Sequence, residues 1–208
     1  MTKVKICGIT NKTDAINASK LGADMLGFVF YEKSKRYVDP ATVAAIVKEL
    51  PPFIARVGVF ADAEEGEIID AASSAGIDII QLHGGESPEL CDRLRSKYRI
   101  MKAFRLKNKK DLRKIKDYDV DFYMMDTYVP DVIGGTGEAF DWAILRGFEL
   151  SKPMVISGGL TPANVIRAIK EMEPYAVDVS SGVESSPGKK DAKLMKYFMD
   201  NIKKVRGS

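Results

Sequence analysis

Short runs of apolar residues recur along the chain, and longer segments with apolar residues at helical spacing follow them. The runs are rich in Val, Ile, Phe and Met, which is typical of strands buried in a parallel sheet. We predict strands at residues 4–7, 25–30, 55–60, 77–82, 100–104, 122–126, 154–157 and 176–179. The segments after them predict helices near residues 12–20, 40–49, 64–75, 88–97, 108–117, 141–147, 162–172 and 190–204.

Three of the expected helices share one starting device, a polar residue followed by proline. It occurs at Asp39-Pro40, Ser87-Pro88 and Thr161-Pro162. The polar side chain accepts a hydrogen bond from the free N–H groups of the first turn. Proline suits the first helical position because it has no N–H and its φ is already helical. We therefore expect helices to begin at these prolines.

The alternation of strands with helices predicts βαβ units and a parallel sheet. Eight such units in 208 residues favour an α/β fold in which residues 1–208 form a single-domain (β/α)8 TIM barrel. The alternative is an open, doubly wound sheet, which more typically has fewer strands and a G-x-G-x-x-G turn after the first strand. Here the first turn reads Cys7-Gly8-Ile9-Thr10, so we favour the barrel.

The composition is that of an ordinary globular protein, with 45% hydrophobic and 29% charged residues. The net charge of +3 comes from scattered lysines, so we expect no nucleic-acid partner. No apolar run is long enough to predict a membrane span, and the chain starts on a strand pattern without a signal peptide. A reduced, cytoplasmic setting is therefore expected.

Amides and metal-ligating residues are scarce. One Gln and five Asn stand beside abundant Lys, Glu and Asp, which favours a thermophilic source. The chain has one His and two distant cysteines, Cys7 and Cys91, so no metal site is expected. Cys91 falls within a predicted helix, where a structural role is expected.

Two Gly- and Ser-rich turns follow the last two predicted strands. They read Ser157-Gly158-Gly159-Leu160 and Ser180-Ser181-Gly182. Glycines allow the backbone to approach an anion, and N–H groups and hydroxyls supply donors. Paired turns at this place match the phosphate site of barrel enzymes, so we predict that Gly158, Gly159, Ser180, Ser181 and Gly182 bind the phosphate of a small molecule. The alternative interpretation is two ordinary turns.

Cys7 and Asp126 end the first and sixth predicted strands, at the barrel face where catalytic groups lie. They are expected to face each other across the mouth as a base and an acid. A thiolate acts as a base if its pKa is lowered, and the sequence does not reveal what lowers it. The structural alternatives are a small buried hydrophobe for Cys7 and a cap or loop anchor for Asp126.

Two further side chains follow predicted strands. Arg36 suits a substrate carboxylate, or belongs to a solvated basic loop. His83 either contacts substrate or hydrogen-bonds within the rim. The turn Gly84-Gly85 resembles another anion site, but the adjacent Glu86 argues against it.

These motifs together resemble phosphoribosylanthranilate isomerase of tryptophan biosynthesis. The likeness runs from residue 3 to about 191 and occurs at nearly every strand end. Its motifs are Lys5-Ile6-Cys7-Gly8-Ile9-Thr10, Gly27-Phe28-Val29-Phe30, Ser34-Lys35-Arg36-Tyr37, Arg56-Val57-Gly58-Val59-Phe60, Gln81-Leu82-His83-Gly84, Ser157-Gly158-Gly159-Leu160, Asp178-Val179-Ser180-Ser181-Gly182-Val183-Glu184 and Pro187-Gly188-Lys189-Lys190-Asp191.

The resemblance implies a cofactor-free isomerase that performs an Amadori rearrangement on N-(5-phosphoribosyl)anthranilate. It implies Cys7 as general base, Asp126 as general acid, Arg36 as partner of the anthranilate carboxylate and Asp178 near the ribosyl chain. Its loop at residues 128–138 departs mildly from the family pattern.

Two other functions stay open beside the isomerase. They are the related sugar isomerase of histidine biosynthesis and a phosphometabolite-binding barrel without catalysis. Neither the resemblance nor the residues distinguish a monomer from a homodimer.

Overall fold

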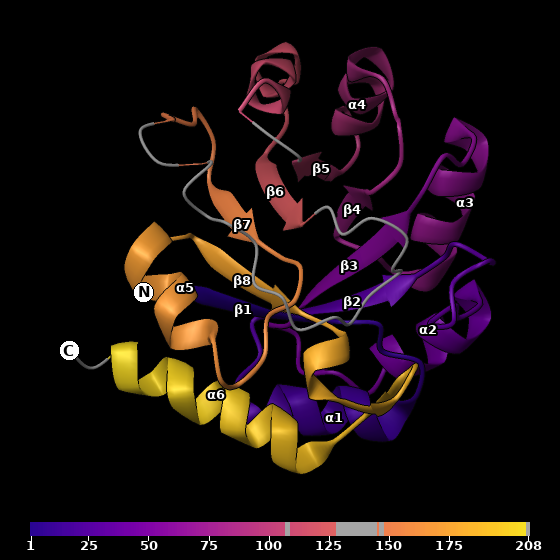
Figure 1. Cartoon of the computed structure of the whole chain (residues 1–208). Coiled ribbons are helices and arrows are strands. Elements are labelled where there is room, and N and C mark those ends of the chain that lie inside the picture. The colour runs from indigo at the N-terminus through magenta and orange to yellow at the C-terminus, as the bar shows by residue number, and fades with distance from the viewer. Residues whose placement is uncertain (107–108, 128–144, 146–147, 207–208) are drawn as a thin grey trace.

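In a computed structural model, which describes residues 1–106, 109–127, 145 and 148–206, eight parallel strands close into a barrel (Figure 1). The strand β1 pairs with β2 on one side, where Cys7 lies opposite Gly27, and with β8 on the other, where Lys5 lies opposite Asp178. The barrel prediction is confirmed and the open sheet is wrong, because an open sheet leaves its edge strands unpaired. The strands are β1 (Lys3–Cys7), β2 (Met25–Val29), β3 (Ala55–Phe60), β4 (Ile79–Leu82), β5 (Arg99–Leu106), β6 (Phe122–Thr127), β7 (Met154–Ile156) and β8 (Ala176–Val179).

Helices lie outside the ring of strands, and α6 packs against both α1 and α5 (Figure 1). The α-helices are α1 (Lys12–Leu21), α2 (Pro40–Val47), α3 (Glu65–Ala75), α4 (Pro88–Arg95), α5 (Val165–Met172) and α6 (Ala192–Arg206). After β8 the chain forms a short 3-10 turn, η3 (Ser181–Val183), and a small antiparallel hairpin of β9 (Glu184–Ser186) and β10 (Lys189–Lys190).

The helix predicted at 108–117 is wrong in type. A 3-10 helix, η1, occupies Asp111–Asp117, and Leu112 and Ile115 are its buried residues. Their spacing of three matches the 3-10 repeat, so this short segment buries its apolar residues without an α-helix. The helix predicted at 141–147 lies outside the described residues, apart from Leu145, as does the loop at 128–138.

Two of the three proline-started helices are confirmed. Asp39 Oδ1 accepts from the Thr42 N–H at 2.9 Å, and Ser87 Oγ accepts from the Leu90 N–H at 3.3 Å. The start predicted at Thr161-Pro162 is wrong, because α5 begins only after Asn164. The Asn164 amide instead accepts from the Thr161 N–H and donates to the Gly159 carbonyl, both at 2.8 Å, so these residues form a turn that ties down the loop after β7.

The barrel interior is apolar in its middle layer, with a second, larger core between strands and helices. Side chains along a strand alternate between the two faces, so the residue two positions on points inward again, nearer the carboxyl end. That next inward position carries Gln81 on β4, Asp126 on β6 and Asp178 on β8, and it falls on Ser157 directly after β7. The middle layer consists of Met25, Val57, Ile79, Met101, Ala103, Met124, Val155 and Ala176. A polar layer therefore lies directly on an apolar plug.

Candidate functional site

The Cys7 thiol lies in a buried cluster with Lys5, Asp178 and Ser157. Lys5 Nζ donates to Asp178 Oδ1 at 2.8 Å, and Ser157 Oγ donates to Asp178 Oδ2 at 3.0 Å. Lys5 is 0% exposed and Cys7 8%. Cys7 and Asp178 were predicted from the sequence as site residues, whereas Lys5 was not. Its position two residues before Cys7 on one strand was the available signal, because this spacing places both side chains on the same face.

Gly27 lets the thiol and the ammonium come together. A Cβ at this position would lie 2.7 Å from Cys7 Sγ and 2.9 Å from Lys5 Nζ, closer than real Cβ atoms approach. Because Gly27 is the β2 partner of Cys7 in the sheet, its missing side chain leaves room for both groups. Glycine is needed here because it leaves space for its neighbours, and not because the backbone adopts an unusual φ.

Burial and charge act against each other in this cluster. Burial is the larger effect and holds the pKa of the Cys7 thiol above its usual value, while the Lys5 ammonium offsets part of that rise. Burial alone would lower the pKa of Lys5, but Asp178 and Cys7 outweigh it and hold that pKa above its usual value. Lys5 therefore remains an ammonium ion in the interior of the barrel.

On the opposite side of the mouth, Asp126, His83 and Gln81 form a hydrogen-bonded chain. Asp126 Oδ2 lies 2.8 Å from His83 Nε2, and His83 Nδ1 lies 2.8 Å from Gln81 Nε2. With the Gln81 amide assigned this way, Nδ1 accepts and Nε2–H donates to Asp126. Gln81 Oε1 is buried and accepts no hydrogen bond from the described residues. Sequence analysis missed Gln81, and both His83 nitrogens are bonded to protein.

Arg36 is held in plane by a carboxylate. Its Nε and Nη2 donate to the two Glu184 oxygens at 2.8 and 2.7 Å, and Lys190 Nζ donates to Glu184 Oε1 at 2.8 Å. Burial would raise the pKa of Glu184, but the hydrogen bonds from Arg36 and Lys190 lower it overall. Glu184 and Lys190 lay within the motifs read from the sequence, yet neither was assigned a role. Side-chain pairing between distant segments is not visible in one sequence.

The two predicted phosphate turns lie against each other. Gly158 and Gly159 adopt left-handed φ values of 85° and 63°, which other residues rarely adopt. A Cβ on Gly182 would lie 1.9 Å from the Leu160 carbonyl oxygen, so only glycine fits this contact. Ser180 Oγ is buried and has no hydrogen-bond partner among the described residues. The structure thus brings both turns together and leaves a hydroxyl ready to donate.

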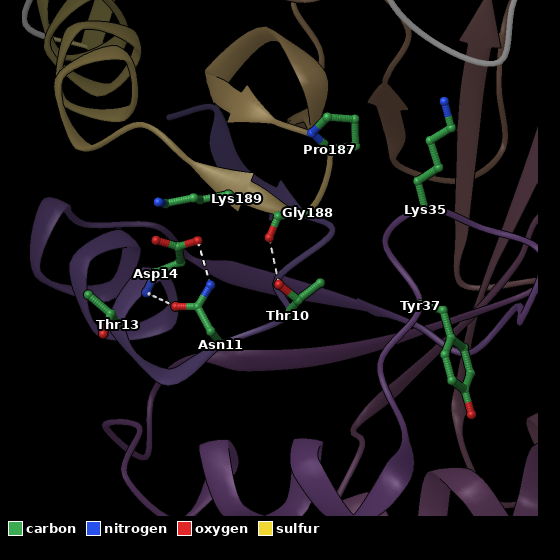
Figure 2. A pocket seen from close by; sticks show the side chains of 9 residues that line it. All are labelled: Thr10, Asn11, Thr13, Asp14, Lys35, Tyr37, Pro187, Gly188 and Lys189. Carbon is green, nitrogen blue, oxygen red and sulfur yellow. Dashed lines mark hydrogen bonds between the residues drawn. The ribbon is translucent and has the colours of Figure 1, made fainter.

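The hairpin β9–β10 is fastened to the loop after β1 and to the first turn of α1. Thr10 Oγ1 donates to the Gly188 carbonyl at 2.5 Å (Figure 2). The Lys190 N–H donates to Asp14 Oδ2, in α1, at 2.8 Å. A cleft of about 570 Å³ lies beside this contact, lined by Thr10, Asn11, Thr13, Asp14, Lys35, Tyr37, Pro187, Gly188 and Lys189. None of the predicted site residues lines this cleft. The fastening fixes the hairpin that presents Glu184 and Lys190 to Arg36.

The turn after β4 is occupied by a carboxylate of the chain itself, that of Glu86. The Glu86 carboxylate accepts from the Gly84 N–H at 2.9 Å and from the Asp62 N–H at 3.0 Å. Lys102 Nζ donates to Glu86 Oε2 at 2.9 Å. The sequence argument that Glu86 speaks against an anion site at Gly84-Gly85 agrees with this arrangement, because Glu86 accepts from the Gly84 N–H and Asp62 Oδ1 accepts from the Gly85 N–H. The network fixes the turn that carries His83.

Within the described part of the chain, no group of three or more His, Cys, Asp or Glu side chains is placed to hold a metal ion. Of the helices it contains, none has the length and apolar character needed to cross a bilayer.

Residues 4–201 match the sequence model of a family described as N-(5'phosphoribosyl)anthranilate (PRA) isomerase. A curated relative, N-(5'-phosphoribosyl)anthranilate isomerase from Geobacter sp. (strain M21), is 49% identical over 205 residues. That alignment covers 99% of this chain and 100% of the relative.

Solved structures show the same likeness, and each alignment covers 98% of this chain and 100% of the other. Phosphoribosyl anthranilate isomerase from Thermotoga maritima is 44% identical, with a TM-score of 0.92. An isomerase in complex with reduced 1-(o-carboxyphenylamino)-1-deoxyribulose 5-phosphate is 42% identical, with a TM-score of 0.88. Mutually generated monomers of the dimeric Thermotoga maritima enzyme are 42% identical, with a TM-score of 0.89.

Proposed function

The chain belongs to the N-(5'-phosphoribosyl)anthranilate isomerase family of tryptophan biosynthesis, and we propose that Cys7 and Asp126 catalyse its reaction as base and acid. The reaction turns N-(5-phosphoribosyl)anthranilate into 1-(2-carboxyphenylamino)-1-deoxyribulose 5-phosphate. It rearranges protons and one ring bond within a single molecule, so no electrons leave the substrate. The observation that carries the proposal is the placement of a thiol and a carboxyl group on inward positions of β1 and β6, in the polar layer of the mouth.

The substrate is anchored at its two charged ends. The phosphate lies against the turns that contain Gly158, Gly159 and Ser181, where Ser180 Oγ and turn N–H groups donate to it. The anthranilate carboxylate lies near Arg36, whose plane Glu184 fixes. The reduced product bound to a structural relative likewise has a carboxyphenyl group at one end and a phosphate at the other. Anchoring both ends places the sugar between acid and base.

The first chemical step opens the furanose ring. Asp126, protonated, gives its proton to the ring oxygen as the bond from that oxygen to C1 breaks, and C1 becomes a protonated Schiff base with the anthranilate nitrogen. Asp126 is left as a carboxylate. The His83 N–H, 2.8 Å away, stabilises that negative charge, so we propose that His83 acts through Asp126 in addition to its position at the rim.

The second step moves a proton from carbon. The Cys7 thiolate takes the proton from sugar C2, and the electron pair of that C–H bond neutralises the iminium nitrogen to give an enolamine. The enolamine then tautomerises to the ketone, losing the C2 hydroxyl proton and gaining one at C1. Asp178, held by Lys5 and Ser157, lies below this part of the substrate and orients the ribosyl hydroxyls.

Removal of either catalytic group tests the proposal. Cys7→Ala and Asp126→Asn are each expected to lower kcat by about a hundredfold to ten-thousandfold, the usual contribution of a positioned acid or base. Turnover is followed by the loss of the fluorescent anthranilate adduct. Cys91→Ala, which removes the other buried thiol, is the matched control and retains turnover.

Near-normal kcat in a folded Cys7→Ala or Asp126→Asn protein rejects the assigned role. Binding of the substrate without turnover in the unaltered protein would instead favour a phosphometabolite-binding barrel.

We also propose that the chain associates as a homodimer. Phe53, in the loop before β3, is 93% exposed, so this large aromatic side chain is available to pack against a second copy, and aromatic residues are enriched at interfaces. The Thermotoga maritima relative is described as dimeric. Phe53→Ser is expected to give a monomer in analytical ultracentrifugation, whereas Tyr197→Ser, on an exposed face of α6, leaves the dimer intact. If the unaltered protein sediments as a monomer at micromolar concentration, the proposal of a homodimer is wrong.

A further inference from the structure

We propose that Lys5 is a positioning residue that stabilises the thiolate form of Cys7, the form that abstracts the proton. This inference rests on the proposed role of Cys7 as the base. Lys5 lies one inward position below Cys7 on β1 and is 0% exposed, so its ammonium group is not placed on the rim. It acts on the reaction through the thiol.

The geometry places Lys5 Nζ between two acidic groups. Asp178 Oδ1 is 2.8 Å away on one side. On the other side, Cys7 Sγ and Lys5 Nζ both lie within 3 Å of the place where a Gly27 Cβ would be. Lys5 is fully buried and Cys7 and Asp178 are nearly so, and in buried surroundings a nearby charge acts strongly on its neighbour.

A purely structural Lys5–Asp178 pair does not explain this arrangement well. Buried ion pairs contribute little net stability, and packed apolar residues of the same size serve equally well in that role. The neighbouring inward positions of the plug are in fact apolar, as Met25 and Ala176 show. A charged pair at this one place, directly beneath the thiol, is explained by a requirement for charge.

The charges around Cys7 point the same way. The groups that face it are Lys5 on β1, Asp178 on β8, Lys190 on β10 and Arg36 in the loop after β2. Glu184 binds both Arg36 and Lys190. Three cations and two carboxylates leave one positive charge uncompensated, and a thiolate at Cys7 cancels it. Without Lys5 the cluster is already neutral, and forming a thiolate there costs more free energy.

No proton leaves Lys5 in this scheme. Cys7 accepts the C2 proton and becomes a thiol, while Lys5 remains an ammonium ion bound to Asp178. The raised pKa of Lys5 agrees with this, because a buried lysine without such partners would lose its charge.

Titration of the thiol by its absorbance near 240 nm tests the proposal. Each protein is compared with the same protein carrying Cys7→Ala, so that only Cys7 contributes to the difference. Lys5→Met is expected to raise the Cys7 midpoint by about one pH unit or more, since one counter-charge is lost. Asp178→Asn is expected to lower it. Lys3→Met, which removes an exposed lysine from the same strand, leaves it unchanged.

Two variants that move the midpoint in opposite directions exclude a merely structural role, because damage to packing does not reverse sign. An unchanged midpoint in folded Lys5→Met overturns the proposal. If Lys5→Met does not fold, an unchanged or raised midpoint in Asp178→Asn overturns it.

Kinetics separate this proposal from the role of Cys7 itself. Lys5→Met is expected to lower kcat at neutral pH by about tenfold or more, with KM changed less than about threefold. Part of the lost kcat returns as the pH is raised, because the thiolate is then formed without its counter-charge. If Cys7→Ala retains turnover, the base assignment fails whatever the titration shows. If Lys5→Met shifts the midpoint but leaves kcat unchanged, the proposed contribution of Lys5 to catalysis is wrong, while the assignment of Cys7 as the base still stands.

Discussion

The two sides of the barrel mouth control a proton by different means. On β1 and β8, the Cys7 thiol lies beside a buried ammonium–carboxylate pair. On β6, Asp126 has 18% of its side chain exposed and is hydrogen-bonded to His83, which is in turn hydrogen-bonded to Gln81 on β4. A base that must lose its proton in a dry place needs positive charge beside it. An acid needs a neighbour that stabilises the carboxylate it becomes, which a directed N–H supplies.

The residues that hold each side in place differ as well. Lys102→Met is expected to have the largest effect, and that effect should be confined to the acid side. Lys102 is 2% exposed, and its Nζ donates to Glu86 and to the Leu82 and Gly84 carbonyls, beneath the turn that carries His83. Removing the ammonium leaves Glu86 buried without its counter-charge. The free energy of unfolding is expected to fall by about 3–5 kcal/mol, measured by urea denaturation.

The matched control for this change is Arg93→Met, which breaks the exposed ion pair with Glu65 and should cost less than about 1 kcal/mol. The thiol midpoint of Cys7 should be the same in Lys102→Met as in the unaltered protein, since Lys102 supports only the acid side. A shifted midpoint would show that the two sides are coupled and would break the comparison.

On the base side, Gly27→Ala is the corresponding change. The new Cβ would lie 2.7 Å from Cys7 Sγ and 2.9 Å from Lys5 Nζ, so the thiol and the ammonium must move apart. We expect kcat to fall by about tenfold to a hundredfold, as small displacements of catalytic groups do, and unfolding to become easier by about 1–3 kcal/mol. Steady-state kinetics and urea denaturation measure the two effects.

Gly66→Ala supplies the control for the glycine change. A Cβ there meets no atom within 4 Å, and the site is in α3, so stability should stay constant or rise by about 1 kcal/mol with kcat unchanged. Equal kinetic effects of Gly27→Ala and Gly66→Ala would contradict the close thiol–ammonium contact.

On the acid side, the direction of one hydrogen bond is open to test. Gln81→Leu removes the donor to His83 Nδ1 and is expected to lower kcat by about tenfold, the worth of one buried hydrogen bond. Gln81→Glu keeps the shape but offers an acceptor, which reverses the proton on His83 and removes the N–H from Asp126. Its kcat should fall at least as far. Wild-type kcat in Gln81→Glu would reject the assigned orientation.

Much of this architecture was predictable because it depends on local patterns. Buried parallel strands are continuous apolar runs, so all eight were found, and the caps at Asp39 and Ser87 were found from adjacent residues. The start at Pro162 failed because Asn164 binds the loop after β7 in place of a helix start. That competition depends on the position of the Gly159 carbonyl, which no local pattern encodes.

The residues of the site fall into the same two groups, those that a local sequence pattern reveals and those that only the fold brings together. Cys7, Asp126 and the two glycine turns end strands, and strand ends are visible in the sequence. The residues that tune them are not. Lys5 is read as an ordinary strand residue until β8 brings Asp178 beside it, 173 positions along the chain. Glu184 likewise meets Arg36 only through the fold, 148 positions away.

The smallest expected effect concerns this last pair, and it contrasts an ionic support with the hydrogen-bonded acid side. The hydrogen bonds from Arg36 and Lys190 hold the pKa of Glu184 below its ordinary value despite its burial. A carboxyl group with a lowered pKa in the folded state stabilises the protein above its unfolded pKa, and that contribution is lost as the pH falls through the folded pKa. The stability advantage over Glu184→Gln, of the order of 1 kcal/mol near pH 7, should therefore shrink below about pH 4.5.

Glu32→Gln removes the same charge from an exposed position, and its stability should follow the unaltered protein across this range. Thermal unfolding between about pH 3 and 7 measures both variants against the unaltered protein. An advantage that persists undiminished at the acid end would mean that Glu184 contributes through packing alone, and Arg36 would then owe its fixed plane to shape and not to charge.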